Sequence, residues 1–267
     1  MDILKKLFGY LVHLYVSFYF RNKNVYVISG LRRSGNHALI NWLANSLERS
    51  SVTLSSLNYQ VYQTHSGKTI LLNEVNFYGC IWFIKRIRQI KPLLKHADNV
   101  VISLEDYLPE PRDKYVPAKA YKISVKRKLL NIIASRLTHS IKQASVGLDR
   151  GDMRIDERIV DYRLWQNTVN ADWLVWDFDL WLTSTGYRKK FLNKLNLLDD
   201  IQPKISIQGG GSSFTGKSSA PQAHDLNSRW KHIEWPDRVI NLIRKDANQP
   251  LLTNEEWEFI STYEAPK

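Results

Sequence analysis

Short apolar runs alternate along the chain with segments in which apolar residues recur every three or four positions. The apolar runs predict β-strands at residues 25–28, 69–72, 99–104, 121–125 and 173–176. Strands that alternate with helices favour an α/β fold, in which helices cover both faces of a central parallel sheet to form a three-layer sandwich. Ligands of such folds bind at the carboxyl ends of the strands.

The helical periodicity follows most of these strands. It predicts helices at residues 39–47, 81–95, 128–147, 155–170, 187–198, 235–246 and 254–263. Residues 50–68 are polar and rich in turn-forming residues, so a loop is expected there. The chain from 25 to 267 has the length of one large domain.

Residues 1–24 form a separate N-terminal segment that predicts an apolar helix. The apolar run at 7–20 is shorter than the roughly 20 residues that span a bilayer, and no small-residue cleavage site follows it. On a helix, Lys5, Gly9, His13 and Ser17 would form one narrow polar stripe. Such a helix either lies on a membrane surface or docks on its own domain. With no room for a lumenal stem before the first strand, we expect a cytoplasmic protein, with peripheral contact at the inner face of the plasma membrane as the open alternative.

Charge and cysteine content narrow the classes of partner. A net charge of +12 favours anions, which include nucleotides, acidic saccharides, anionic lipids and nucleic acids. The basic residues are dispersed and match no nucleic-acid-binding motif, so a nucleic-acid partner is not expected. The single cysteine, Cys80, excludes an intrachain disulfide and fits a reducing compartment. Nothing in the composition indicates an oligomeric state.

The stretch from residue 25 to residue 43 carries the strongest functional signal, because a strand, a glycine loop and a helix follow one another. Gly30 and Gly35 flank four residues, and this arrangement is typical of a loop whose backbone N–H groups cradle a phosphate. Arg32 and Arg33 add positive charge.

The loop lacks two parts of the nucleotide-hydrolase P-loop. Asn36 and His37 stand where that loop has the lysine that reaches the outer phosphates and the hydroxyl that holds Mg²⁺. We therefore expect an anion site without a metal ion. The alternatives are a P-loop nucleotide kinase or hydrolase, and a non-enzymatic basic anion-binding protein.

A second glycine-rich segment lies at residues 208–219, with the sequence QGGGSSFTGKSS. Its composition suits a flexible linker. However, Phe214 and Lys217 are unusual in a spacer, and helical patterns follow it, so a lid that closes on an anion is the preferred interpretation.

Three separated motifs resemble the superfamily of sulfotransferases that use 3′-phosphoadenosine 5′-phosphosulfate (PAPS). The sequence Arg-Ser-Gly-Asn-His at 33–37 is similar to the superfamily's 5′-phosphosulfate loop, commonly Lys/Arg-Ser-Gly-Thr-Thr. Arg127 and Ser135 have the spacing of its 3′-phosphate motif, although Lys128 and Leu129 replace the usual Asp-Pro. Asn-Glu-Val at 73–75 resembles the strand end that carries the catalytic glutamate in heparan-type members.

This resemblance implies a P-loop-like sulfotransferase fold in a bacterial-type, single-domain member. It implies that Glu74 is the catalytic base and that Arg33 stabilises the leaving group, while Glu105, Asp106 and His37 remain alternative bases. It implies PAPS as co-substrate, no metal ion, and an acceptor hydroxyl on a carbohydrate or glycolipid, as in polysaccharide biosynthesis. The residues implied to bind PAPS are Arg32, Arg33, Ser34, Gly35, Asn36, His37, Arg127, Ser135, Gly210, Gly211, Ser212, Ser213 and Phe214.

Overall fold

The computed structural model describes residues 2–58, 60–107, 115–144, 172–201, 228–245 and 252–263. The strands are β1 (Asn24–Gly30), β2 (Leu54–Asn58), β3 (Val61–Thr64), β4 (Thr69–Leu72), β5 (Asn99–Glu105), β6 (Ala120–Lys126) and β7 (Leu174–Asp177). The helices are α1 (Asp2–Tyr19), α2 (Asn36–Glu48), α3 (Val75–Leu94), α4 (Leu129–Ala144), α6 (Phe178–Thr183), α7 (Thr185–Lys194), η2 (Arg229–His232), α9 (Asp237–Lys245) and α10 (Asn254–Thr262).

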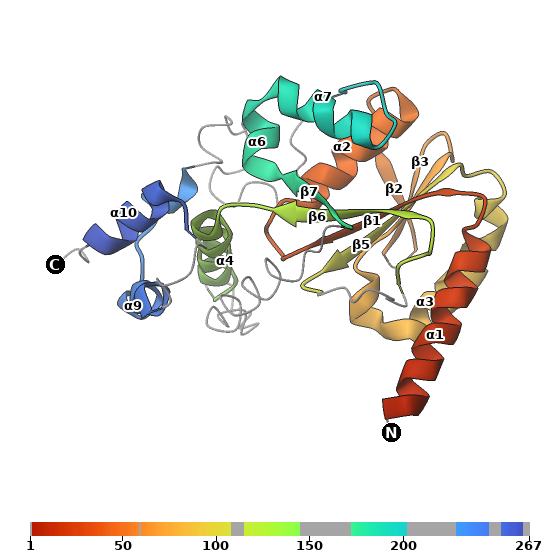
Figure 1. Cartoon of the computed structure of the whole chain (residues 1–267), viewed down its shortest axis with the longest axis horizontal. Coiled ribbons are helices and arrows are strands. Elements are labelled where there is room, and N and C mark those ends of the chain that lie inside the picture. The colour runs from red at the N-terminus through yellow and green to blue at the C-terminus, as the bar shows by residue number, and fades with distance from the viewer. Residues whose placement is uncertain are drawn as a thin grey trace.

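The strands form one sheet of seven in the order β2-β3-β4-β5-β1-β6-β7 (Figure 1). Strands β4, β5, β1, β6 and β7 are parallel to one another, whereas β3 pairs antiparallel with β4 and β2 pairs antiparallel with β3. The central strand β1 is buried on both sides: Val25 and Val27 face one apolar cluster, and Tyr26 and Ile28 face another. A parallel sheet needs cover on both faces, which explains its continuous apolar runs.

Helices supply that cover. Helices α1 and α3 pack on one face of the sheet, and α2, α6 and α7 pack on the other (Figure 1). Helix α4, η2, α9 and α10 form a third apolar cluster that reaches the loop after β1 through Leu31. The predicted α/β class and the parallel centre of the sheet are therefore confirmed, and the layers fit a three-layer sandwich.

Two local predictions are wrong. Residues 50–68 contain the hairpin β2–β3 rather than a loop, because its polar residues lie on an edge where Ser55, Ser56 and Leu57 are exposed. The helix expected at 81–95 is present as the part of α3 that follows a kink at Gly79 (φ 76°), but an unexpected helical segment from Val75 precedes it. Glu74 therefore stands at the N-cap position of a helix instead of ending a strand. The helix expected at 155–170 and the glycine-rich segment at 208–219 lie outside the described residues.

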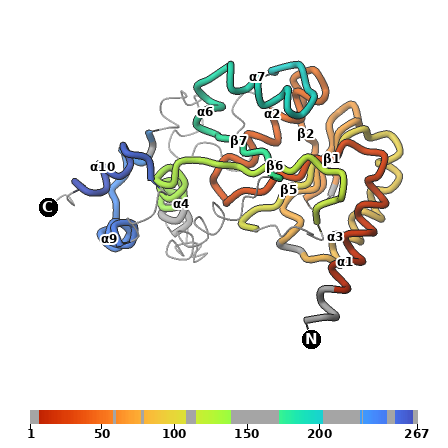
Figure 2. Tube along the Cα trace, in the orientation of Figure 1, coloured from red at the N-terminus to blue at the C-terminus, as the bar shows by residue number. Residues whose placement is uncertain are grey.

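Helix α1 docks on its own domain, which is one of the two arrangements expected from its sequence. Val12, Val16 and Phe20 are buried in the cluster that contains α3. Helix α1 lies beside α3 and runs away from the sheet toward its amino-terminal end (Figures 1 and 2). Within the described residues, no helix has both the length and the apolar content needed to cross a membrane.

Candidate functional site

The loop between β1 and α2 lies at the carboxyl ends of the parallel strands. Gly30 ends β1 and is in register with Glu105 of β5 and Val125 of β6. A Cβ atom on Gly30 would lie 2.8 Å from the Cβ atom of Val125 and 2.9 Å from Oγ of Ser34. The first glycine of the motif is therefore required by close packing between strand and loop.

The second glycine shapes the start of α2. Gly35 has a φ of 114°, and a Cβ atom on it would overlap the ring of Phe178. Helix α2 begins at Asn36 without a side-chain cap. Among the residues that the structure describes, the backbone N–H groups of Gly35, Asn36 and His37 have no hydrogen-bond partner. An uncapped helix start with free N–H groups is suited to bind an anion.

Asn36, at the position of the P-loop lysine, has a buried side chain that points beneath the loop. Its Nδ2 donates to the carbonyl of Gly30 (3.3 Å) and to Oε1 of Glu105 (3.1 Å), while its Oδ1 accepts from Oγ of Ser34 (3.2 Å). This side chain braces the loop against β5. Because its side chain is engaged in these hydrogen bonds, the group that Asn36 can offer to an anion is its backbone N–H.

A histidine and two glutamates gather beside the loop. One nitrogen or oxygen atom from each of His37, Glu74 and Glu105 lies within 4.8 Å of the others. Nε of Arg32 is 3.5 Å from Oε2 of Glu105, and Nδ1 of His37 is 4.0 Å from Oε1 of the same residue. The structure thus brings together four residues that come from the loop, from the first turn of α2, from the N-cap of α3 and from the end of β5.

Glu74 has the properties of a general base in this group. It is half-buried and occupies a left-handed conformation, with φ 49°, directly before α3. Burial raises the pKa of Glu74, and the negative charge of Glu105 raises it further, whereas Arg32, His37 and Asn73 lower it. A raised pKa makes the carboxylate a stronger proton acceptor at neutral pH.

Asn76 holds Glu74 and Glu105 next to each other. The Nδ2 atom of Asn76 donates to the carbonyl of Glu105 (2.8 Å), and the backbone N–H of Glu105 donates to Oδ1 of Asn76 (3.1 Å). This reciprocal pair fastens the first turn of α3 to the end of β5. The asparagine two residues after the candidate base is visible in the sequence, but its partner strand was not predictable from it.

A buried ion pair clamps the loop from the other side. Oδ1 of Asp106 accepts from the backbone N–H of Arg32 (2.8 Å) and from Nη2 of Arg136 (3.0 Å), and Nη2 of Arg136 also donates to the carbonyl of Arg32 (2.9 Å). The side chains of Asp106 and Arg136 are 4 % and 2 % exposed. Asp106, an alternative base in the sequence interpretation, is thereby engaged in holding the loop.

Replacement of Arg136 by methionine should lower the free energy of unfolding by about 3–5 kcal/mol, because it leaves the carboxylate of Asp106 buried without its counter-ion. Denaturant unfolding followed by circular dichroism measures this change. Lys189→Met, on the exposed surface of α7, is the matched control and should stay within about 0.5 kcal/mol of the wild type. Equal stability of the two variants would contradict the clamp.

Arg127 supports the loop from the end of β6. It is 4 % exposed, its Nη1 donates to the carbonyl of Arg33 (2.9 Å), and its guanidinium lies 4.4 Å from the centre of the Phe178 ring. Burial lowers the pKa of Arg127 to about 10 and the carboxylate of Asp179 opposes this shift, so the side chain stays charged at neutral pH. Ser135 is buried in α4. Residues 210–214, the other part of the expected nucleotide site, lie outside the described residues.

A pocket of about 270 Å³ opens beside the cluster, between α2 and the antiparallel strands. It combines aliphatic, aromatic and amide side chains. Its lining residues are His37, Ile40, Asn41, Leu54, Tyr62, Leu71 and Asn73. Because His37 and Asn73, the neighbour of Glu74, form part of its wall, this pocket lies next to the cluster.

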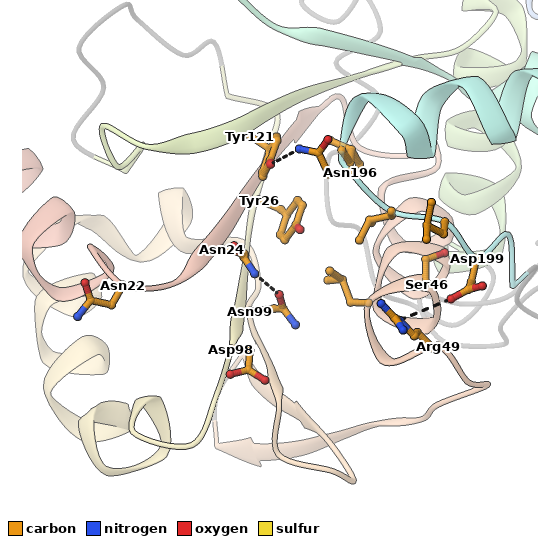
Figure 3. A pocket seen from close by; sticks show the side chains of 14 residues that line it. Asn22, Asn24, Tyr26, Ser46, Arg49, Asp98, Asn99, Tyr121, Asn196 and Asp199 are labelled. Atoms are coloured by element: carbon orange, nitrogen blue, oxygen red, sulfur yellow. Dashed lines mark hydrogen bonds and ion pairs between the residues drawn. The ribbon is translucent and has the colours of Figure 1, made fainter.

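A second cavity, of about 540 Å³, lies at the opposite, amino-terminal end of the sheet (Figure 3). Asn24 and Asn99 hydrogen-bond across its floor at the starts of β1 and β5 (3.1 Å). The rings of Tyr26 and Tyr121 stack beside them, with their centres 5.1 Å apart. The cavity shares no lining residue with the loop or the cluster, so it is no part of the candidate site.

No family model, curated protein or solved structure matches the chain. The fold and the site together define an α/β protein with a glycine loop before an uncapped helix and a carboxylate–histidine cluster at the carboxyl edge of its sheet. Any closer functional assignment rests on the chemistry of these residues.

Proposed function

We propose that the protein is a sulfotransferase that moves a sulfuryl group from PAPS to an acceptor hydroxyl, on the P-loop-like sulfotransferase variant of this α/β fold. One observation carries the proposal. The uncapped start of α2 offers free N–H groups to an anion, and a glutamate with a raised pKa stands beside it. The lysine and the hydroxyl that serve Mg²⁺-dependent phosphoryl transfer are both replaced.

Each of these residues has a separate role in the transfer reaction. Glu74 takes the proton from the acceptor hydroxyl while the acceptor oxygen forms its bond to sulfur. The bond between sulfur and the 5′-phosphate oxygen breaks, and the electron pair leaves with the phosphate of adenosine 3′,5′-bisphosphate. The loop N–H groups and Arg33 stabilise the charge that develops on that oxygen.

The pocket beside His37 supports a hydroxylated acceptor such as a sugar of a glycan or glycolipid. Tyr62 offers an aromatic ring, and Asn41 and Asn73 offer amide groups that pair with hydroxyls. A volume of about 270 Å³ limits the bound part of the acceptor to a small group.

A metal-dependent P-loop kinase or hydrolase is the competing function, because His37, Glu74 and Glu105 are types of side chain that bind divalent metal ions. The position of Arg32 favours the metal-free proposal. Its guanidinium is 3.5 Å from Oε2 of Glu105 and already supplies the positive charge that a metal ion would bring.

Calorimetric titration separates the two functions. The sulfotransferase should bind adenosine 3′,5′-bisphosphate in the presence of EDTA, and at least about tenfold more tightly than ATP with Mg²⁺, because only the former carries a 3′-phosphate. Transfer of label from radioactive PAPS to a panel of glycans, glycolipids and small alcohols then identifies the acceptor. Tighter, Mg²⁺-dependent binding of ATP would overturn the proposal in favour of the kinase or hydrolase.

A further inference from the structure

Helix α1 exposes an apolar surface on the side that faces away from the domain. Six large apolar side chains of this helix are each between 46 % and 61 % exposed. They are Leu7, Phe8, Tyr10, Leu11, Leu14 and Phe18. Four of them, at positions 7, 11, 14 and 18, have the spacing of a single helical stripe. Contiguous exposed apolar surface on a protein marks an interaction site.

The small polar residues of α1 face the domain. The hydroxyl of Ser17 accepts a hydrogen bond from the backbone N–H of Ala118 (3.0 Å), and His13 is partly buried. They share this inner side with Val12 and Val16. Helix α1 therefore carries apolar residues on its outer side as well as on its inner side, whereas an ordinary surface helix presents polar residues to solvent. An apolar outer face indicates that this face has a partner of its own.

Basic side chains flank the apolar stripe. The guanidinium carbon of Arg21 lies 4.8 Å from the centre of the Phe18 ring, and Nζ of Lys91 in α3 lies 6.0 Å from that of Tyr19. Burial raises the pKa of the Tyr15 hydroxyl, and the positive charge of Arg88, also in α3, opposes this shift. Arg21, Arg88 and Lys91 are all exposed. Apolar side chains beside exposed cations match the acyl and phosphate regions at the surface of an anionic membrane.

We propose that α1 lies along the surface of an anionic lipid bilayer, with the stripe from Leu7 to Phe18 in the acyl region and Arg21, Arg88 and Lys91 at the phosphates. Because the inner face of α1 is held against α3, the outer face is the one that enters the lipid. A second copy of the chain fits this face less well. Residues 1–21 contain three basic residues and one acidic residue, so two packed α1 helices would bring like charges together. This proposal does not depend on the sulfotransferase proposal.

Vesicle flotation tests the proposal with two matched variants of the full chain. Leu11→Glu places a charge in the stripe, and Leu198→Glu places the same charge at a residue that is 80 % exposed outside α1. The wild type should float with vesicles of phosphatidylcholine containing about a third phosphatidylserine, and at least about tenfold more weakly with phosphatidylcholine alone. Leu11→Glu should lose about tenfold or more in partitioning, while Leu198→Glu should float like the wild type.

Both substitutions are at exposed positions, so thermal unfolding of both variants should match that of the wild type. The membrane proposal is overturned if the wild type fails to float with the anionic vesicles or if Leu11→Glu floats as well as Leu198→Glu. A wild-type dimer that Leu11→Glu converts to a monomer, without any vesicle binding, would assign the stripe to a second copy of the chain instead.

Discussion

Replacement of Glu74 by glutamine should lower the rate of sulfuryl transfer by about 10²–10⁴-fold, which is the usual contribution of a general base. The amide keeps the size of the carboxylate but cannot accept a proton from the acceptor. Binding of adenosine 3′,5′-bisphosphate should stay unchanged, because the loop N–H groups and Arg33 do not depend on that carboxylate. Single-turnover transfer from PAPS and calorimetric titration measure the two quantities separately.

The pH dependence provides a second signature of the same residue. The wild-type rate should fall as the pH is lowered through the raised pKa of Glu74, because the protonated carboxyl group is no longer a base. Glu105→Gln removes the neighbouring negative charge that helps to raise this pKa, so the fall should move to lower pH. In Glu74→Gln the residual rate should no longer show this fall at low pH.

The substitution Glu74→Gln should raise the stability of the fold although it lowers the activity. A carboxyl group whose pKa is higher in the folded state stabilises the fold below its unfolded pKa, and this contribution is lost as the pH rises through the folded pKa. Glu74→Gln should therefore unfold at a higher temperature than the wild type near pH 8, and the difference should vanish near pH 4.

Glu258→Gln, on the exposed surface of α10, is the control and should match the wild type in rate, binding and stability. Full transfer activity in Glu74→Gln would reject Glu74 as the base. The assignment would then pass to His37 or Glu105, the other members of the cluster.

The central parallel strands were predictable because most of their residues are buried on both faces, so that they read as continuous apolar runs. This holds for β1, β4, β5 and β6, which were placed within about two residues of their observed ends. The hairpin β2–β3 was missed because an edge strand with one exposed face can carry serine and glutamine, and these residues resemble a loop in the sequence.

The site was predictable in its local part and not in its tertiary part. The loop follows from the spacing of Gly30 and Gly35, since close packing and a positive φ require glycine within one short segment. In contrast, Asn76 and the pair of Asp106 and Arg136 act across different elements, at sequence separations of 29 and 30 residues. No local pattern encodes such contacts, because they depend on which strand ends lie side by side.

The orientation of α1 on the domain was unpredictable for the same reason. The periodicity of its sequence located a narrow polar stripe but could not say which side of the helix the domain covers. The hydrogen bond from Ala118 to Ser17 answers that question, because it places the polar side inward. The apolar majority of the helix surface is thereby left outside, where it forms the proposed membrane contact.

Replacement of Gly35 by alanine should lower kcat/KM for PAPS by about 10²–10³-fold, which is the typical loss for one misplaced donor to a developing oxyanion. At a φ of 114° an alanine is strained by about 1–3 kcal/mol, and its methyl group overlaps the ring of Phe178. The loop can relieve the backbone strain and the overlap only by moving the N–H groups at the start of α2. The wild type and Gly35→Ala should therefore differ in calorimetric affinity for adenosine 3′,5′-bisphosphate as well as in rate.

Gly186→Ala is the matched control for this change. Gly186 lies in α7 without a positive φ, and a Cβ atom there would meet its nearest neighbour, Oγ of Ser184, at 3.8 Å. This variant should keep the wild-type affinity and rate. If Gly35→Ala folded normally and also kept the wild-type affinity and rate, the N–H groups at the start of α2 would not bind the nucleotide. The anion would then have to be held by Arg32 and Arg33 alone, and the loop would lose its proposed role as the phosphosulfate site.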